Sequence, residues 1–165
     1  MNFTIKGLKT WATHEGGGFQ FSLYRDGKKF AWIHNNGNGG PLDITYEDTK
    51  DKPNADSKFR REVLAFLPSC KWWDEWEKQD QEFREKYQVP ERDDSQKLNL
   101  REESLMYRLL EDHEFAQKIA RLRKKSTLFR LLTDAESVVR SVNTLDIEQA
   151  KRVLEKHHPN NYQFL

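Results

Sequence analysis

The sequence has little cysteine and no long apolar run. Cys70 is the one cysteine among 165 residues, which excludes an internal disulfide framework and a cysteine-based zinc site, and fits a reducing compartment. No apolar stretch approaches the roughly 20 residues that a membrane span needs. The N-terminus lacks the basic and then apolar organisation of a signal peptide. We therefore expect a cytoplasmic protein that makes no membrane contact.

An excess of charge of one sign is also missing. Lysine and arginine total 28 and aspartate and glutamate 27, so the net charge is +1, which gives no overall attraction to nucleic acid or membrane. Apolar residues make up only 36%, but ten Phe, five Trp and five Tyr compensate, because each buried aromatic removes roughly 150–250 Å² from water. The length predicts one folded domain over residues 1–165.

Alternating apolar residues predict a first strand near residues 2–12. The dipeptide Asp26-Gly27 favours a type I′ hairpin turn between two further strands, near 19–25 and 28–34. Counting outward from this turn pairs Phe21 with Trp32, so that both rings would lie buried on the core face. Another strand is predicted over 42–46.

Helical spacing begins after this strand. It predicts helices over 59–67, from a cap at Ser69 to Tyr87, and over about 101–124. The pattern then returns to strands at 126–133 and 138–142, followed by a helix that Asp146 caps and a last strand at 162–165. This order predicts an α+β fold: an N-terminal antiparallel hairpin and meander, central helices, and a C-terminal strand-strand-helix-strand segment.

The stretch HNNGNGGPLD, residues 34–43, offers the candidate loop residues His34, Asn36, Asn38 and Asp43. Its glycines and asparagines could point several N–H groups at an anion. However, it lacks the spacing of a phosphate-binding loop, and we interpret it mainly as a turn. A small hydrolase or nuclease centred on His34 and Asp43 is an alternative. We predict no catalytic residue, no cofactor and no metal site, because none of the five histidines belongs to a His-Glu-x-x-His pair.

A block of cations without any acid lies between residues 115 and 133. Its members are Lys118, Arg121, Arg123, Lys124, Lys125 and Arg130. They could bind phosphates through counterion release, complement a helix C-terminus, or meet an acidic protein partner. A nucleic-acid-binding accessory protein that uses this block, with Lys28 and Lys29 as a second contact, is therefore an alternative function.

Three tryptophans, Trp72, Trp73 and Trp76, lie in an acidic helical segment. On a helix, Trp72 and Trp76 share a face and Trp73 diverges from it, so one face is not expected to bury all three. They either pack against the sheet or leave one ring exposed as a protein-interface anchor, because Trp is prominent in binding hot spots.

The segments FSLYRDGKKFAWIHNNGNGG and KKSTLFRLLTD together resemble a loosely defined group of small proteins carried by phages, prophages and plasmids. The resemblance implies a phage or mobile-element accessory protein, a setting in which small inhibitors of host defence are common, and a location in the host-cell cytoplasm if the protein is phage-encoded. Our leading hypothesis is accordingly a non-enzymatic protein that binds and blocks a macromolecular partner, such as a host defence complex. The sequence makes no prediction of the oligomeric state.

Overall fold

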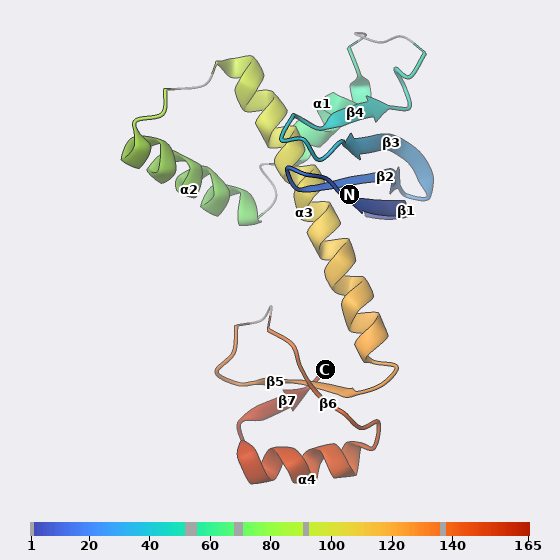
Figure 1. Cartoon of the computed structure of the whole chain (residues 1–165), viewed down its shortest axis with the longest axis vertical. Helices are drawn as coiled ribbons and strands as arrows, with labels where there is room; N and C mark the ends of the chain where they lie inside the picture. The colour runs from blue at the N-terminus through green and yellow to red at the C-terminus, as the bar shows by residue number, and fades with distance from the viewer. Residues whose placement is uncertain (1, 52–55, 68–70, 91–92, 136–137) are drawn as a thin grey trace. The chain divides into compact units, whose positions relative to one another are not determined.

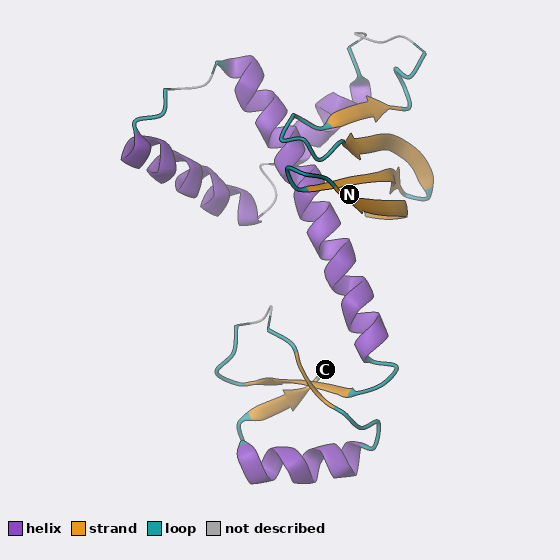
Figure 2. Cartoon of the chain, in the orientation of Figure 1, coloured by secondary structure: helices purple, strands orange, loops and turns teal. Residues whose placement is uncertain are grey.

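The structure is a computed structural model of the chain, and it describes residues 2–51, 56–67, 71–90, 93–135 and 138–165 (Figure 1). The chain divides into two compact units, Met1–Glu111 and Asp112–Leu165. Each has a sheet and a hydrophobic cluster of its own. Antiparallel strands and helices occur in both, which confirms the predicted α+β class (Figure 2). The single domain over residues 1–165 stays a prediction.

Unit 1 contains an antiparallel sheet, sheet A, whose strands lie side by side in chain order. These strands are β1 (Phe3–Ala12), β2 (Gly17–Arg25), β3 (Lys28–Asn35) and β4 (Asp43–Tyr46), so the predicted meander is confirmed. Asp26 and Gly27 have φ angles of 49° and 81°. Two successive positive φ angles are what a type I′ turn requires, and the local prediction for this turn therefore holds.

The register of the β2–β3 hairpin differs from the prediction beyond the turn. Leu23 pairs with Ala31 and Tyr24 with Lys29, which leaves Phe30 as an extra residue in β3. This β-bulge shifts all later pairs by one position relative to a straight ladder. Phe21 therefore meets Ile33 and not Trp32.

The predicted core position of Trp32 is wrong. Trp32 pairs with Ser22 on the opposite face of the sheet, where it is partly exposed, while Ile33 is fully buried. The bulge is stabilised by packing, because it brings both Phe30 and Ala31 into the core. The Phe30 ring stacks on Phe59 at 4.6 Å between centroids.

This register predicts unequal losses of stability for two neighbouring aromatic residues. We expect Phe30→Ala to cost about 3–5 kcal/mol of unfolding free energy, as for a fully buried aromatic side chain. Trp32→Ala should cost less than about 1.5 kcal/mol, because that ring keeps contact with water. Urea denaturation followed by circular dichroism checks both values. Equal losses for the two variants would contradict the bulge.

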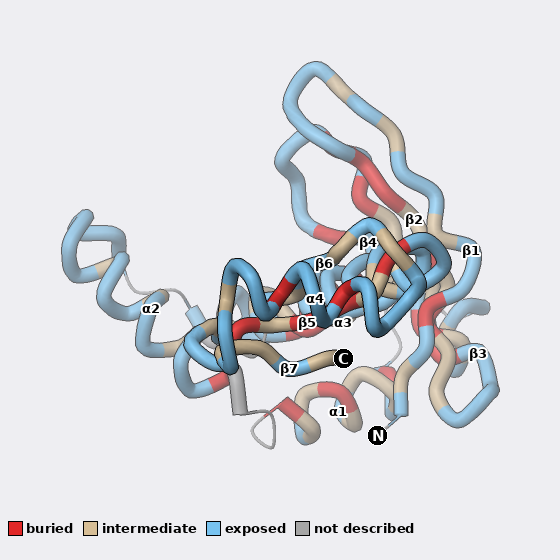
Figure 3. The backbone as a smooth tube through the Cα atoms, turned by 90° about the horizontal axis from the view of Figure 1, so that it is seen from below, coloured by how far each residue is buried: buried red, intermediate tan, exposed pale blue. Residues whose placement is uncertain are grey.

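Three helices belong wholly or partly to unit 1: α1 (Lys58–Phe66), α2 (Lys71–Tyr87) and α3 (Asp94–Leu122). One face of sheet A, the inner face, packs against side chains of α1 and α3, among them Val63, Leu105 and Met106. These helix residues are buried, and Figure 3 draws the buried positions of α1 in red. The other face of sheet A is called the outer face below.

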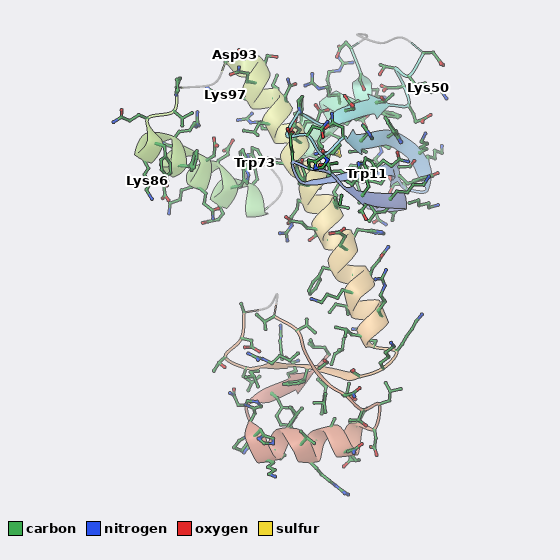
Figure 4. All side chains as sticks on the ribbon, viewed as in Figure 1. Trp11, Lys50, Trp73, Lys86, Asp93 and Lys97 are labelled. Atoms are coloured by element: carbon green, nitrogen blue, oxygen red, sulfur yellow. The ribbon has the colours of Figure 1, made fainter. Side chains whose placement is uncertain are left out.

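Two helix starts show how local capping sets the boundaries. The Ser57 side chain accepts a hydrogen bond from the amide of Arg60 and begins α1 as the spacing predicts. Helix α3 begins at Asp94 and not near Arg101, because Asp93 and Gln96 form a reciprocal capping pair (Asp93 is labelled in Figure 4). The predicted cap at Ser69 lies outside the described residues.

Unit 2 contains a second antiparallel sheet, sheet B, in the order β6-β5-β7. Its elements are β5 (Thr127–Leu131), β6 (Arg140–Val142), α4 (Ile147–His157) and β7 (Tyr162–Phe164). Phe129 and Leu131 pack with Leu154 of α4. Asp146 accepts hydrogen bonds from the amides of Glu148 and Gln149, which confirms its predicted role as the helix cap. Within the described part of the chain, no helix combines the length and apolar character needed to cross a membrane.

Candidate functional site

The outer face of sheet A has an unusual composition for a face without a covering helix. Its side chains follow from the strand register, because directly paired residues point to the same side of a sheet. They are Thr4, Lys6, Lys9, Trp11, Gly18, Gln20, Ser22, Tyr24, Lys29, Trp32, His34, Asp43 and Thr45. None of these described positions carries an aliphatic side chain. The face combines aromatic rings, lysines and small polar groups.

Three rings form a row across this face. The imidazole of His34 lies 5.3 Å from the Trp32 ring, nearly parallel to it, and 5.6 Å from the Trp11 ring. The three side chains are partly exposed. Trp11 comes from β1 and the other two from β3, so the Trp11 ring must extend across the intervening strand β2.

Gly18 makes this crossing possible. A Cβ atom at position 18 would lie 2.1 Å from Nε1 of Trp11, so the indole occupies the space that a side chain would need. Trp11 and Gly18 are direct partners in the ladder. One side of the indole therefore lies against the backbone of β2, and position 18 controls where Trp11 lies.

The predicted pair His34 and Asp43 does come together on the outer face. Nδ1 of His34 lies 3.3 Å from Oδ2 of Asp43, and the two residues are direct partners between β3 and β4. Asp43 is mostly exposed, whereas the His34 side chain is 26% exposed.

The asparagine-glycine loop between these strands is closed by its own hydrogen bonds. Asn36 accepts from the amide of Asn38, and Asn35 accepts from the amide of Gly37. Thr13 donates to the carbonyl of Gly37 at 2.6 Å. The loop therefore uses two of its amides in asparagine turns whose acceptors are the side chains of Asn35 and Asn36, which supports its interpretation as a turn.

Comparison with protein-family models, curated proteins and solved structures finds no match to this chain. The resemblance to phage-borne and plasmid-borne proteins therefore stays a prediction.

The predicted basic block lies in unit 2. Lys118 and Arg121 belong to α3, Arg130 to β5, and residues 123–125 to the turn between these elements. Arg121 and Arg130 donate to the side chains of Gln117 and Gln163. Lys118 and the turn residues 123–125 are exposed, and no carboxylate of the described residues pairs with them. The block is thus available to an anionic partner.

The tryptophans of α2 are arranged around Trp73. This residue is 3% exposed and belongs to the core cluster, and its ring stacks on Trp76 at 4.8 Å. Residues three apart on a helix share a face, so the two tryptophans that stack on each other are Trp73 and Trp76. Trp73 is labelled at the start of α2 in Figure 4. The side chain of Trp72 lies outside the described residues. The partly exposed Trp76 therefore stays the predicted interface anchor among the described tryptophans of α2.

A buried polar network joins β4 to helices α1 and α3. The carboxylate of Glu102, 6% exposed, accepts from the hydroxyl of Tyr46 and, at 3.1 Å, from Nε of Arg60. Arg60 also donates to Asn99. Burial raises the pKa of Tyr46 far above its ordinary value, and the charge of Glu102 adds to this effect. The network lines a cavity of about 570 Å³. Its donors and acceptors are engaged with one another, so we assign it a structural role.

Several residues of the outer face were not predicted. Trp11, Lys6 and Lys9 were not predicted, because the prediction of the first strand rests on its alternating apolar residues and assigns no role to the residues between them. The alternation of Lys9 and Trp11 at a spacing of two was a signal that both face the same side. The role of Gly18 depends on the strand pairing and had no local signal.

Proposed function

We propose that this chain is a non-enzymatic binding protein that acts by occupying a macromolecular partner, and that the outer face of sheet A is its binding surface. The observation that carries the proposal is the row of Trp11, His34 and Trp32 on a face that no described helix of the core cluster covers. Partly exposed aromatic rings on a rigid sheet supply contact area at low cost in conformational entropy.

The contact between His34 and Asp43 also favours a second candidate, the hydrolase or nuclease. A carboxylate beside Nδ1 is how many enzymes orient a catalytic imidazole. The direct strand partners of His34 are Gln20 and Asp43, however, and neither supplies a hydroxyl or thiol nucleophile. Among the described residues, no group of three or more His, Cys, Asp or Glu side chains could hold a metal. The binding function has the stronger support.

Blocking of a host defence complex and phage origin remain part of the proposal through the sequence resemblance alone, and a cytoplasmic location through the low cysteine content. The basic block of unit 2 offers a separate anion-binding surface, supported by its exposed cations. It is the alternative location for a nucleic-acid contact.

The binding surface can be tested by comparing three forms of the whole protein in pull-downs from a bacterial lysate. We expect the wild type to capture a defined partner, and the Trp11→Ala/Trp32→Ala variant to capture at least about ten times less of it. The control variant Phe83→Ala/Tyr87→Ala removes two exposed aromatic residues of α2 and should capture as much as the wild type. Equal capture by all three forms would show that the outer face is not the binding surface.

A further inference from the structure

The composition of the outer face separates two classes of macromolecular occupant. Protein interfaces are depleted in lysine at their centres, and their cores are closely packed and largely apolar. Here lysines stand beside the rings, and aliphatic side chains are absent from the described outer positions. Aromatic rings with interleaved cations are instead the pattern by which proteins bind unpaired nucleic-acid strands.

The charges on this face favour an anionic occupant. Lys6 lies 4.3 Å above the Tyr24 ring, and Lys6 and Lys9 have no carboxylate of the described residues within ion-pair distance. Both side chains are exposed. The acidic residue of the face, Asp43, is occupied by His34, and Lys29 pairs with Glu47 at 2.5 Å. The two lysines on β1 are therefore free to contact phosphates.

The geometry of the rings favours bases as the second point of contact. The Trp11 indole has one side against the backbone at Gly18 and is partly exposed. Trp32 stacks on His34, which fixes the orientation of its ring. Base–aromatic stacking uses such fixed, partly exposed rings and tolerates every base. A duplex keeps its base faces within its own stack, so only an unpaired strand can use them.

We infer that the outer face of sheet A binds single-stranded nucleic acid, with bases stacked on Trp11 and Trp32 and phosphates held by Lys6 and Lys9. This inference rests on the proposed function, because it names the occupant of the same surface. It needs no sequence preference, since neither stacking nor phosphate contacts read base edges. Gln20, Ser22 and Thr45 lie beside the rings and supply hydrogen-bonding groups.

Fluorescence anisotropy with labelled oligonucleotides of about 12 residues tests the inference on the full chain. We expect a single strand to bind at least about ten times more tightly than a duplex of the same composition. The Trp11→Ala/Trp32→Ala variant should lose at least about 30-fold in affinity for the single strand. Gly18→Ala should lose affinity to a similar degree as Trp11→Ala alone, because the added Cβ displaces an indole that is still present.

The lysines are tested by the dependence of affinity on salt. Lys6→Ser/Lys9→Ser should reduce the slope of log K against log salt by about 0.7 per lost contact on a single strand. The matched control Lys118→Ser/Arg121→Ser/Lys125→Ser removes cations from unit 2 and should change the affinity by less than about three-fold. Unchanged circular dichroism spectra verify that each variant is folded.

Two outcomes would overturn the inference, and each points elsewhere. If no single strand binds at about 50 mM salt, while pull-down capture still depends on the outer face, the occupant is a protein and the proposed function stands. If binding survives in the tryptophan variant but is lost in the unit 2 control, the basic block is the nucleic-acid site. In that case the outer face has no part in binding nucleic acid.

Discussion

Replacing Glu102 with leucine is expected to lower the free energy of unfolding of unit 1 by about 3–5 kcal/mol. The carboxylate is the shared acceptor of Tyr46 and Arg60 in a buried position. Its removal leaves the buried hydroxyl of Tyr46 without an acceptor and takes from the partly exposed Arg60 one of its two acceptors, the other being Asn99. All five tryptophans lie in unit 1, so the midpoint of tryptophan fluorescence in urea reports this unit alone.

The neighbouring residue provides a matched control. Burial raises the pKa of the Glu103 carboxyl, so folding disfavours its ionised form. The stability linked to Glu103 is therefore present at low pH and is lost as the pH rises through its raised pKa. Glu103→Gln keeps an acceptor for the amide of Leu42 and removes this loss, so the variant should be at least as stable as the wild type at pH 7. A large loss of unfolding free energy for Glu103→Gln, with no loss for Glu102→Leu, would contradict the structural role assigned to the network around Glu102.

A second large effect is expected at Gly37, where we predict that alanine costs about 3–4 kcal/mol. The φ angle of 82° is strained for any residue with a side chain, and the new Cβ would lie 2.8 Å from the backbone nitrogen of Gly18 and 2.7 Å from Thr13. Backbone atoms cannot move aside as a flexible side chain can. The loss is measured by the same urea titration.

Gly39 separates the two causes of this effect. Its φ angle is 72°, close to that of Gly37, but no atom lies within 4 Å of the position of a Cβ. Gly39→Ala should therefore cost only the conformational strain, about 1–2 kcal/mol. Equal losses at both positions would show that the contact of the loop with Thr13 and Gly18 contributes nothing.

The features predicted correctly from the sequence are those that neighbouring residues determine. The turn at Asp26-Gly27 and the cap at Asp146 need only a few residues of context, and both occur as predicted. The start of α3 was also local, because Asp93 and Gln96 form its cap. The sequence prediction placed this start near residue 101 and missed the cap.

Long-range packing accounts for what could not be predicted. The bulge at Phe30 depends on the stacking of that ring on Phe59, which lies on a helix much later in the chain. The outer face follows from this register, since only the bulge turns Trp32 and His34 together away from the core. The buried acceptor Glu102 meets Tyr46 across 56 positions of sequence, and no local pattern indicates that contact.

At the level of the gene, the bulge gives this strand a one-sided tolerance to changes of length. β3 is longer by one residue than its pairing with β2 requires. Loss of the codon for Ala31 would straighten the ladder with Phe30 opposite Leu23, and Trp32 and His34 would keep their partners Ser22 and Gln20. Gain of a codon there would add a second unpaired residue to β3, and the shifted register would turn the rings of Trp32 and His34 toward the core. Relatives that retain the outer face are thus expected to differ by deletion, and not by insertion, at this point of the hairpin.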